Sequence, residues 1–545
     1  MNSFSALHRI EILNHLKSKT FDLLVIGGGI TGSGIALDAA SRGLSVALIE
    51  KKDFAFGTSS RSTKLIHGGL RYLKQLEFGL VKEVGSERAV VHRLATHLVI
   101  PEKMLLPLSE GKSMGYWLTS IGLKIYDWLA GVKEEDRRRM LSRPQTLHAE
   151  PLLRKQGIKG GALYAEYRTD DARLTIEIIK TAVKFGASAI NYVKGNGFLY
   201  DEKGLVNGVL AHDEIAGENI SIRAKVVVNA TGPWVDELRN ANQSLSGKRL
   251  HLTKGIHVVI DRENFPVQQA VYFEVDDGRM IFAIPRGTKT YIGTTDTNYQ
   301  ESKDEVYATA EDVDYLLKAV NQNFDRVKLF RNHVESTWAG LRPLIHEDGK
   351  STSELSRKDE IFQSNSGLIS IAGGKLTGYR KMAERVVDMV VQDHFPDRQL
   401  NPCTTDKIFL SGNAFKNYKE VIRYRVGILK QLIPAGLRDQ ADYLVSTYGN
   451  QTDSILLQAR QAGSISEESL LQSEMDFCIN HEMALQPDDF LIRRTGWLFF
   501  NISKLKKVKP AVMEFYRSKF GWDEAKFEEM SLQLEQVVSN TIPDW

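Results

Sequence analysis

A glycine-rich turn near the N-terminus constrains the fold of this 545-residue chain more than any other feature. The apolar run FDLLVI at 21–26 ends in GGGITG at 27–32. A segment with helical spacing follows, Gly43 stops it, and a second apolar run at 44–49 ends at Glu50. Strand, glycine turn, helix and strand in this order predict a βαβ unit of a parallel sheet.

Three glycines of the turn fit the pattern GxGxxG. Gly27 permits the tight turn, Gly29 lets backbone N–H groups approach a pyrophosphate, and Gly32 lets helix and strand pack closely. Glu50 stands where a carboxylate can bind both ribose hydroxyls, and it would repel a 2′-phosphate. We therefore predict a dinucleotide site that disfavours NADP. The motif by itself is compatible with both NAD and FAD.

Later glycine turns bear on that choice. VVVNATGPW at 226–234 and GLISIAGGKLTGYRK at 367–381 each run from an apolar strand into glycines. Such ends suit a long extended cofactor such as FAD, although ordinary strand–helix turns would look the same. The loop GTSSRSTKLIHGGLRYL at 57–73 gathers small hydroxyls, glycines and cations, which favours an anionic ligand.

Composition excludes several classes of protein. The net charge of +3 argues against a protein that binds nucleic acid through a basic surface. Cys403 and Cys478 are too far apart for a CxxC pair, so we expect free thiols in a reducing cytoplasm and no metal site. No apolar run is long enough to span a bilayer. Residues 1–19 lack signal-peptide features, and we expect a short amphipathic helix there.

The spacing of apolar residues divides the rest of the chain into a strand-rich part and a helical part. Alternating apolar residues at 250–300 predict antiparallel strands, and helical patterns dominate from Phe415 onward. A boundary is expected at 400–412. The predicted fold class is α/β with a helical C-terminal part.

Motifs along the chain resemble those of a known protein family. GGGITGSGIALDAASRGLSVALIE and GTSSRSTKLIHGGLRYLKQLEFGLV, within 21–107, resemble the FAD-dependent glycerol-3-phosphate dehydrogenases of the aerobic, bacterial type. The likeness covers nearly the whole chain. It continues in DDARL (170–174), NATGPWV (229–235), TKGIHVVI (253–260), IGTTDT (292–297), GLRPLI (340–345), GGKLTGYRKMAE (373–384) and DDFLIRRTGWLFF (488–500).

The resemblance implies a Rossmann-like FAD-binding domain of the D-amino-acid-oxidase type, a mixed-sheet substrate domain and an all-helical C-terminal cap. The expected parts are an N-terminal helical arm (1–19), a discontinuous FAD-binding domain (20–90, 160–235 and 360–400), a substrate-binding domain (91–159 and 236–359) and the helical C-terminal domain (405–545).

The implied reaction is the oxidation of sn-glycerol 3-phosphate to dihydroxyacetone phosphate. A hydride passes from C2 to N5 of FAD, and electrons pass to a membrane quinone. The alternative is a glycerol-3-phosphate oxidase, which uses oxygen and produces hydrogen peroxide. Such oxidases typically carry a long insertion after GLRPLI. In this chain, only residues 343–356 lie between Arg342 and Arg357. A flavin-binding sensor and an NAD-linked dehydrogenase are further alternatives.

The resemblance also implies roles for individual residues. The expected catalytic residues are His257, Arg342 and Lys375, with His257 as first candidate for the general base and His67 as its rival. The expected substrate ligands are Arg71, Tyr72, His257, Arg342, Arg357 and Lys375. The expected FAD ligands are Gly27, Gly29, Gly32, Glu50, Ser59, Ser60, Lys64, His67, Gly68, Val193, Gly232, Gly374, Lys375, Leu376 and Thr377.

Quinone lies in the bilayer, so we expect a cytoplasmic protein that binds peripherally to the inner face of the membrane, through anionic lipid. A homodimer is compatible with the resemblance. Residues 116–132 have the spacing and aromatic content of an interfacial helix, although a core helix would share that pattern. WLFF at 497–500, followed by lysines between Lys504 and Lys509, is the second candidate for lipid contact.

Overall fold

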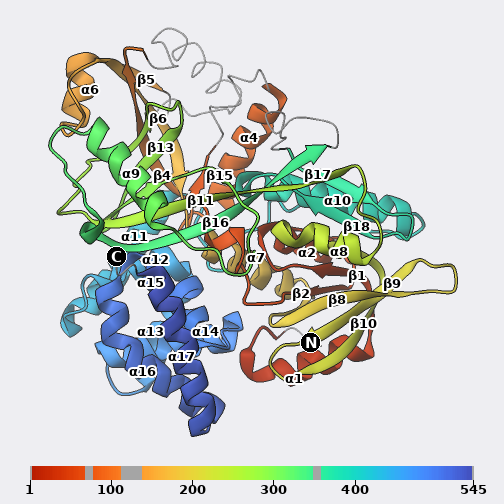
Figure 1. Cartoon of the computed structure of the whole chain (residues 1–545). Helices are drawn as coiled ribbons and strands as arrows, with labels where there is room; N and C mark the ends of the chain where they lie inside the picture. Colours follow the sequence, from red (N-terminus) through yellow and green to blue (C-terminus); the bar gives the residue numbers. More distant parts are fainter. Residues whose placement is uncertain (1–2, 68–77, 112–137, 348–357, 543–545) are drawn as a thin grey trace.

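The computed structural model describes residues 3–67, 78–111, 138–347 and 358–542. Figure 1 shows two β-sheets side by side, with the blue C-terminal helices against them. The predicted α/β class, with a mixed second sheet and an all-helical C-terminal region, is confirmed.

The first sheet is built around the predicted βαβ unit. β1 pairs in parallel with β2 and β10, and after its first residue it is fully buried, as an apolar run between helices should be. The order is β17-β18-β10-β1-β2-β7, with β8 and β9 continuing from β10, and α2 packs against both α7 and α10. The bounds are β1 Thr20–Ile26, α2 Ile30–Arg42, β2 Val46–Ile49, α7 Asp171–Lys184, β7 Ser188–Ile190, β8 Val193–Tyr200, β9 Val206–Asp213, β10 Glu218–Asn229, β17 Glu360–Gln363, β18 Ile369–Ala372 and α10 Tyr379–His394.

The second sheet has the order β15-β11-β14-β13-β12-β4-β6-β3, with β16 beside β11 and β5 beside β6. The antiparallel strands predicted at 250–300 are present, and the parallel pair β12–β4 makes the sheet mixed. The bounds are β3 Leu65–Ile66, α4 Phe78–Leu94, β4 Ile100–Ser109, β5 Arg139–Ser142, α6 Arg143–Ala149, β6 Ile158–Arg168, β11 Lys248–Asp261, β12 Ala270–Glu274, β13 Met280–Arg286, β14 Lys289–Gly293, β15 Thr297–Asn298, α9 Ala310–Asn323 and β16 Val334–Glu347.

The chain passes between the two sheets at two neighbouring places, near β3 and at the end of β6. β3 pairs with the end of β6, and the Thr169 N–H donates to the Lys64 carbonyl at 2.9 Å. β6 then leads directly into α7 on the first sheet. The sequence prediction assigned most of β6 to the FAD-binding part through 160–235, whereas β6 pairs in the second sheet. The residue-level division into domains stays a prediction.

The C-terminal region is helical, as predicted, and Cys403 and Cys478 are free thiols. Its helices contact α7 through α14 and β16 through α15 and α17. The bounds are α11 Tyr418–Leu432, α12 Gln440–Tyr448, α13 Thr452–Gln461, α14 Glu467–Glu482, η10 Asp489–Arg494, α15 Trp497–Phe500, α16 Ile502–Phe520 and α17 Glu524–Thr541.

The expected N-terminal helix is α1, Arg9–Ser18. Ile12, Leu13 and Leu16 are buried, whereas Ile10 is 71% exposed. Arg9 ties the helix to the first sheet by donating to the Asn191 carbonyl at 2.6 Å and to the Asp213 carboxylate at 2.6 Å. α1 is therefore docked on β7 and β10 rather than extended as a free arm.

The hypothesis that WLFF contacts lipid is wrong. Trp497, Leu498 and Phe499 in α15 are buried, and the Phe499 carbonyl accepts a hydrogen bond from Ser336 of β16 at 2.6 Å. Phe499 packs on Trp338 of the second sheet, whereas Trp497 packs on Tyr443 and Phe490 of the C-terminal helical region. These side chains therefore offer no apolar surface to a membrane. The other candidate, 116–132, lies outside the described residues. Within the described ranges, no helix is both long and apolar enough to cross a bilayer.

A buried charge cluster fastens the C-terminal helices to α7. The Glu482 carboxylate of α14 accepts hydrogen bonds from Arg173 at 2.5 and 2.8 Å and from Lys180 at 2.8 Å. Glu177 binds the same two cations. Because Glu482 is fully buried, its removal would leave cations inside the interface with too little negative charge.

We expect Glu482→Gln to lower the free energy of unfolding by about 3–5 kcal/mol. Its cationic partners hold the pKa of Glu482 below its ordinary value, so its stabilisation is complete above pH ~4.5 and is lost as pH falls below that. Chemical denaturation at pH 7 measures the loss. Glu467→Gln, which breaks an exposed pair with Lys507, is the control and should cost less than about 1 kcal/mol. Equal losses in both variants would contradict the argument.

Candidate functional site

The turn between β1 and α2 forms a cradle at a helix N-terminus. Gly27 has φ +111°, and a Cβ there would lie 2.6 Å from the Ala230 carbonyl oxygen. A Cβ on Gly32 would lie 1.9 Å from the Gly27 oxygen. The N-cap residue Gly29 provides no side-chain cap, and the Ile30 N–H donates to Ser59 at 2.9 Å. The open first turn of α2 therefore suits a phosphate group.

The other predicted cradle residues gather nearby. The Glu50 carboxylate accepts the Gly28 N–H at 2.7 Å, and burial raises its pKa. The Val193 N–H donates to the Glu50 carbonyl at 2.8 Å, so these two residues share one edge of the sheet. Gly232, with φ +56°, begins the short turn that ends at Trp234. An extended dinucleotide fits this arrangement of helix terminus, carboxylate and glycines.

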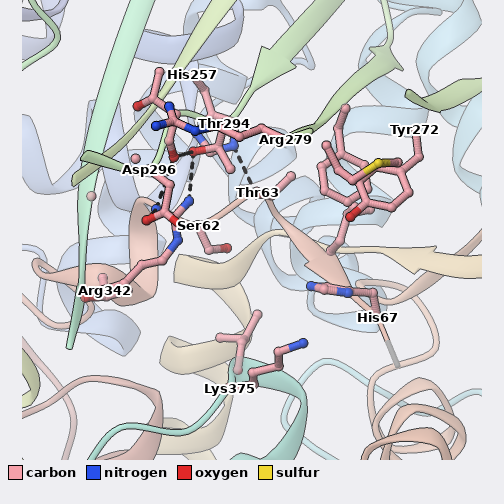
Figure 2. A pocket seen from close by; sticks show the side chains of 18 of the residues that line it. Ser62, Thr63, His67, His257, Tyr272, Arg279, Thr294, Asp296, Arg342 and Lys375 are labelled. Atoms are coloured by element: carbon pink, nitrogen blue, oxygen red, sulfur yellow. Dashed lines mark hydrogen bonds and ion pairs between the residues drawn. The ribbon is translucent and has the colours of Figure 1, made fainter. Parts of the chain in front are cut away.

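A cavity of about 820 Å³ lies between the two sheets, close to this cradle. Figure 2 shows polar side chains from the second sheet at one end, where His257, Thr294, Asp296 and Arg342 lie. Tyr272 and His67 lie toward the other end, and Lys375 points in from the first-sheet side. The cavity thus has a cationic end and an aromatic end.

The loop between the cradle and the cavity is fixed by one buried carboxylate. Asp171 accepts the Ser62 N–H at 3.0 Å, the Ser62 hydroxyl at 2.7 Å and the Lys64 ammonium at 2.5 Å. Lys64 has φ +56°, a conformation that side chains rarely adopt. From the other sheet, the Trp338 indole donates to the Ser62 carbonyl at 3.1 Å. The predicted FAD ligands Ser59, Ser60 and Lys64 belong to this loop.

His257 of β11 forms part of the cavity wall and is only 2% exposed. Its ring stacks on Trp338 with centroids 4.6 Å apart, and its Nε2 lies 3.0 Å from Thr63 Oγ1. A Cβ on Gly293 would come within 2.0 Å of the ring, so the neighbouring strand leaves room for it. Burial, then the charges of Arg342 and Lys64, hold the pKa of His257 well below its ordinary value. The imidazole is therefore neutral near pH 7.

Arg342 of β16 has its guanidinium fixed at the polar end. It donates to Thr294 Oγ1 at 2.9 Å, to the Thr295 carbonyl at 3.2 Å and to Asp296 at 3.3 Å. A Cβ on Gly255 would lie 2.3 Å from one of its terminal nitrogens, so glycine leaves space for the side chain. A guanidinium held at the wall of a cavity suits a phosphate or carboxylate.

The remaining predicted residues enter from the first-sheet side. Gly374, Lys375, Leu376 and Thr377 line the cavity together with His67. The Thr377 hydroxyl donates to the His67 carbonyl at 3.3 Å, which joins the two glycine-rich segments. At the aromatic end, Tyr272 and Phe282 stack with centroids 4.1 Å apart.

The structure thus brings the predicted residues into two adjoining groups. Gly68, Arg71, Tyr72 and Arg357 lie outside the described residues. Those that line the cavity are His67, His257, Arg342, Gly374, Lys375, Leu376 and Thr377. Those that form the cradle and the fixed loop are Gly27, Gly29, Gly32, Glu50, Ser59, Ser60, Lys64, Val193 and Gly232.

Sequence reasoning missed several residues of the site. Asp171 and Thr294 stand in the quoted motifs DDARL and IGTTDT, so a signal existed, but no role followed from it. Thr63 was noted only as one hydroxyl of a polar loop. Trp338 carried no sequence signal, because its contacts with His257 and Ser62 join distant parts of the chain.

Comparison with known proteins gives matches over nearly the whole chain. A family model described as FAD dependent oxidoreductase matches residues 22–380, and one described as C-terminal domain of alpha-glycerophosphate oxidase matches 403–527. The aerobic glycerol-3-phosphate dehydrogenase of Bacillus subtilis (strain 168) is 50% identical, with 99% of each chain covered. That of Staphylococcus aureus (strain USA300) is 48% identical over 98% of this chain and 97% of the relative.

Solved structures of similar proteins share the fold of this chain. The glycerol-3-phosphate dehydrogenase from Bacillus halodurans complexed with FAD is 44% identical, with a TM-score of 0.84 and 99% of each chain covered. An L-alpha-glycerophosphate oxidase from Mycoplasma pneumoniae with FAD bound has a TM-score of 0.57 at 18% identity. It covers 70% of this chain and 96% of its own, and it shares the fold.

The electrostatics of the cavity predict a measurable coupling. Arg342→Met should raise the pKa of His257, because it removes a nearby positive charge, yet the pKa should stay below 6.5 because burial is the larger cause. NMR titration of histidine-labelled protein measures it, with His257→Asn to assign the signal. Arg279→Met, at the same cavity but not a cause of the shift, is the control. An unchanged His257 titration in Arg342→Met would contradict the coupling.

Proposed function

Because the chain belongs to the family of FAD-dependent oxidoreductases that contains the aerobic glycerol-3-phosphate dehydrogenases, we propose that it oxidises sn-glycerol 3-phosphate to dihydroxyacetone phosphate. Its cofactor is FAD. The observation that carries the proposal is one cavity in which Arg342, His257 and Lys375 surround a space next to a dinucleotide cradle. These groups supply an anion ligand, a neutral base and a second cation.

The cradle and the fixed loop would hold the cofactor. The first turn of α2 offers N–H groups to the pyrophosphate, and Glu50 offers a carboxylate to the ribose. The segments 58–64 and 374–377 would border the ring system. FAD, when bound, supplies the acceptor for a hydride. Lys375 would stabilise negative charge on a substrate oxygen or at the pyrimidine end of the ring.

Arg342 would bind the substrate phosphate. Its contacts with Thr294, Thr295 and Asp296 keep the guanidinium in place before substrate arrives, which lowers the ordering cost of binding. Arg71, Tyr72 and Arg357 would complete the phosphate site, as the family resemblance implies.

His257 would act as the general base. Oxidation at C2 requires the C2 hydroxyl to lose its proton, and a neutral imidazole can accept it. The low pKa of His257 keeps the ring unprotonated throughout the range above pH 6.5. The activity should therefore show no loss on the acidic side near pH 6.5 from this group.

Electrons would pass from the cofactor to a membrane quinone, with the protein peripheral on the inner face of the cytoplasmic membrane. The relatives are named as dehydrogenases and not as oxidases, which favours an acceptor other than oxygen. The matched C-terminal family model is named for an oxidase, so oxygen is the second candidate. The two differ in whether hydrogen peroxide forms.

Addition of glycerol 3-phosphate to the FAD-loaded protein without oxygen should bleach the flavin absorbance. A soluble quinone should then restore it, and admission of air should yield little peroxide. Stoichiometric peroxide would assign the protein as an oxidase, and an unbleached flavin would contradict the proposed substrate. Co-sedimentation with anionic liposomes at low salt tests the membrane contact, and its failure would remove that part of the proposal.

Arg342→Lys should raise the dissociation constant for glycerol 3-phosphate by about 10- to 100-fold, because a lysine cannot make the paired hydrogen bonds of a guanidinium. The concentration dependence of flavin reduction measures it, and the flavin content should be unchanged. Arg279→Lys, at the same cavity, is the control and should bind substrate with near-normal affinity. Unchanged affinity in Arg342→Lys would contradict the phosphate role.

His257→Asn should slow flavin reduction by about 100-fold while FAD stays bound, because it removes the proton acceptor. Anaerobic stopped-flow mixing with glycerol 3-phosphate measures this single turnover. An unchanged rate would exclude His257 from the mechanism and leave His67 as the rival.

A further inference from the structure

The proposed base is less accessible from the cavity than its neighbour Thr63. His257 is 2% exposed, whereas Thr63 is partly exposed and lines the same cavity. The Nε2 atom of His257 lies 3.0 Å from Thr63 Oγ1, as the dashed line in Figure 2 shows. The ring atom that faces the loop is therefore already engaged by a hydroxyl. A substrate hydroxyl in the cavity reaches Thr63 more readily than it reaches the imidazole.

The imidazole is also held in one orientation. Trp338 stacks on it at an interplanar angle of 11°, and β14 passes so close that Gly293 has no space for a Cβ. Within the described residues, the buried Nδ1 atom has no hydrogen-bond partner. Exchanging the two ring nitrogens by rotation would break the hydrogen bond to Thr63. Nε2 is therefore the ring nitrogen that can exchange a proton with Thr63, and it accepts one in the tautomer that carries the ring hydrogen on Nδ1.

Thr63 is equally well fixed. Its carbonyl accepts a hydrogen bond from the Tyr291 hydroxyl at 3.1 Å. Its neighbours Ser62 and Lys64 are both bound to Asp171. Because the residues before and after Thr63 are both held, the loop keeps the Thr63 hydroxyl between the cavity and His257.

We infer that Thr63 is a further catalytic residue, which takes the proton of the substrate C2 hydroxyl while its own proton passes to His257 Nε2. This inference rests on the proposed oxidation of glycerol 3-phosphate. The C2 O–H bond breaks and its electron pair completes the carbonyl. The C2 hydrogen leaves with its electron pair, as hydride, to the FAD of the holoenzyme. Substrate loses two electrons and two hydrogens, and His257 gains one proton.

Substrate itself would strengthen the base. The positive charge of Arg342 is one cause of the low pKa of His257. A phosphate dianion on Arg342 would offset that charge, so the imidazole accepts a proton more easily when substrate is present. Proton transfer through Thr63 to His257 is therefore favoured in the enzyme–substrate complex and disfavoured in the free enzyme.

The test compares Thr63→Val, which has nearly the same shape without the hydroxyl, with Thr63→Ser, which keeps it. Both holoenzymes are mixed without oxygen with glycerol 3-phosphate, and flavin reduction is followed. Thr63→Val should be slower by about 100-fold with unchanged flavin content and substrate affinity, and Thr63→Ser should retain most of the rate. A wild-type rate in Thr63→Val, or an equal loss in Thr63→Ser, would overturn the inference.

Two measurements separate a relay from a packing role. The double variant Thr63→Val with His257→Asn should be no slower than the slower single variant, because both residues serve one transfer. In mixtures of H2O and D2O, the wild-type rate should curve with deuterium content, since two protons move together. Additive losses, or a linear dependence in the wild type, would overturn it. An unbleached wild-type flavin would instead contradict the proposed function itself.

Discussion

The carboxylate of Asp171 is the contact on which the rest of the site depends. It stands at the start of α7, directly after the crossing from the second sheet, and it binds Ser62 and Lys64 from the other crossing. Two segments that connect the sheets are thereby fixed to each other. A fully buried carboxylate without these partners would be very costly, so the loop conformation and the α7 start require one another.

The Asp171 contact also determines which side chains of the loop meet the second sheet across the cavity. Because residues 62–64 are fixed, the Thr63 hydroxyl meets His257 of β11, and the Ser62 carbonyl meets Trp338 of β16. β11 and β16 pair along nearly their whole lengths, which places His257 and Arg342 on one rigid surface. The first sheet brings the cradle proposed for the cofactor, and the second brings the proposed anion ligand and the proposed base. Their relative placement follows from the buried loop between them.

The sequence revealed what depends on neighbours along the chain. Gly27 and Gly32 could be predicted because tight turns and helix–strand packing require glycine locally. His257 and Arg342 were found through motifs, whereas their pairing across β11 and β16 was not. The partnership of Thr63 with His257 escaped prediction because it joins positions 194 residues apart. WLFF was misjudged for the same reason: exposure depends on tertiary packing, and composition alone fits both core and surface.

The corrected role of WLFF gives the C-terminal helices a function in the site. Phe499 and Phe500 lie against Trp338, with ring centroids 5.3 and 5.6 Å away, and Trp338 in turn stacks on His257. Behind the cavity wall, the helical part thus supplies the layer that keeps Trp338 and the imidazole in place. Two buried ion pairs hold this layer against the first sheet: Glu482 of α14 with Arg173 of α7, and Arg494 of η10 with Asp53, which follows β2. The C-terminal region therefore supports the position of His257 by packing, without reaching the cavity through these side chains.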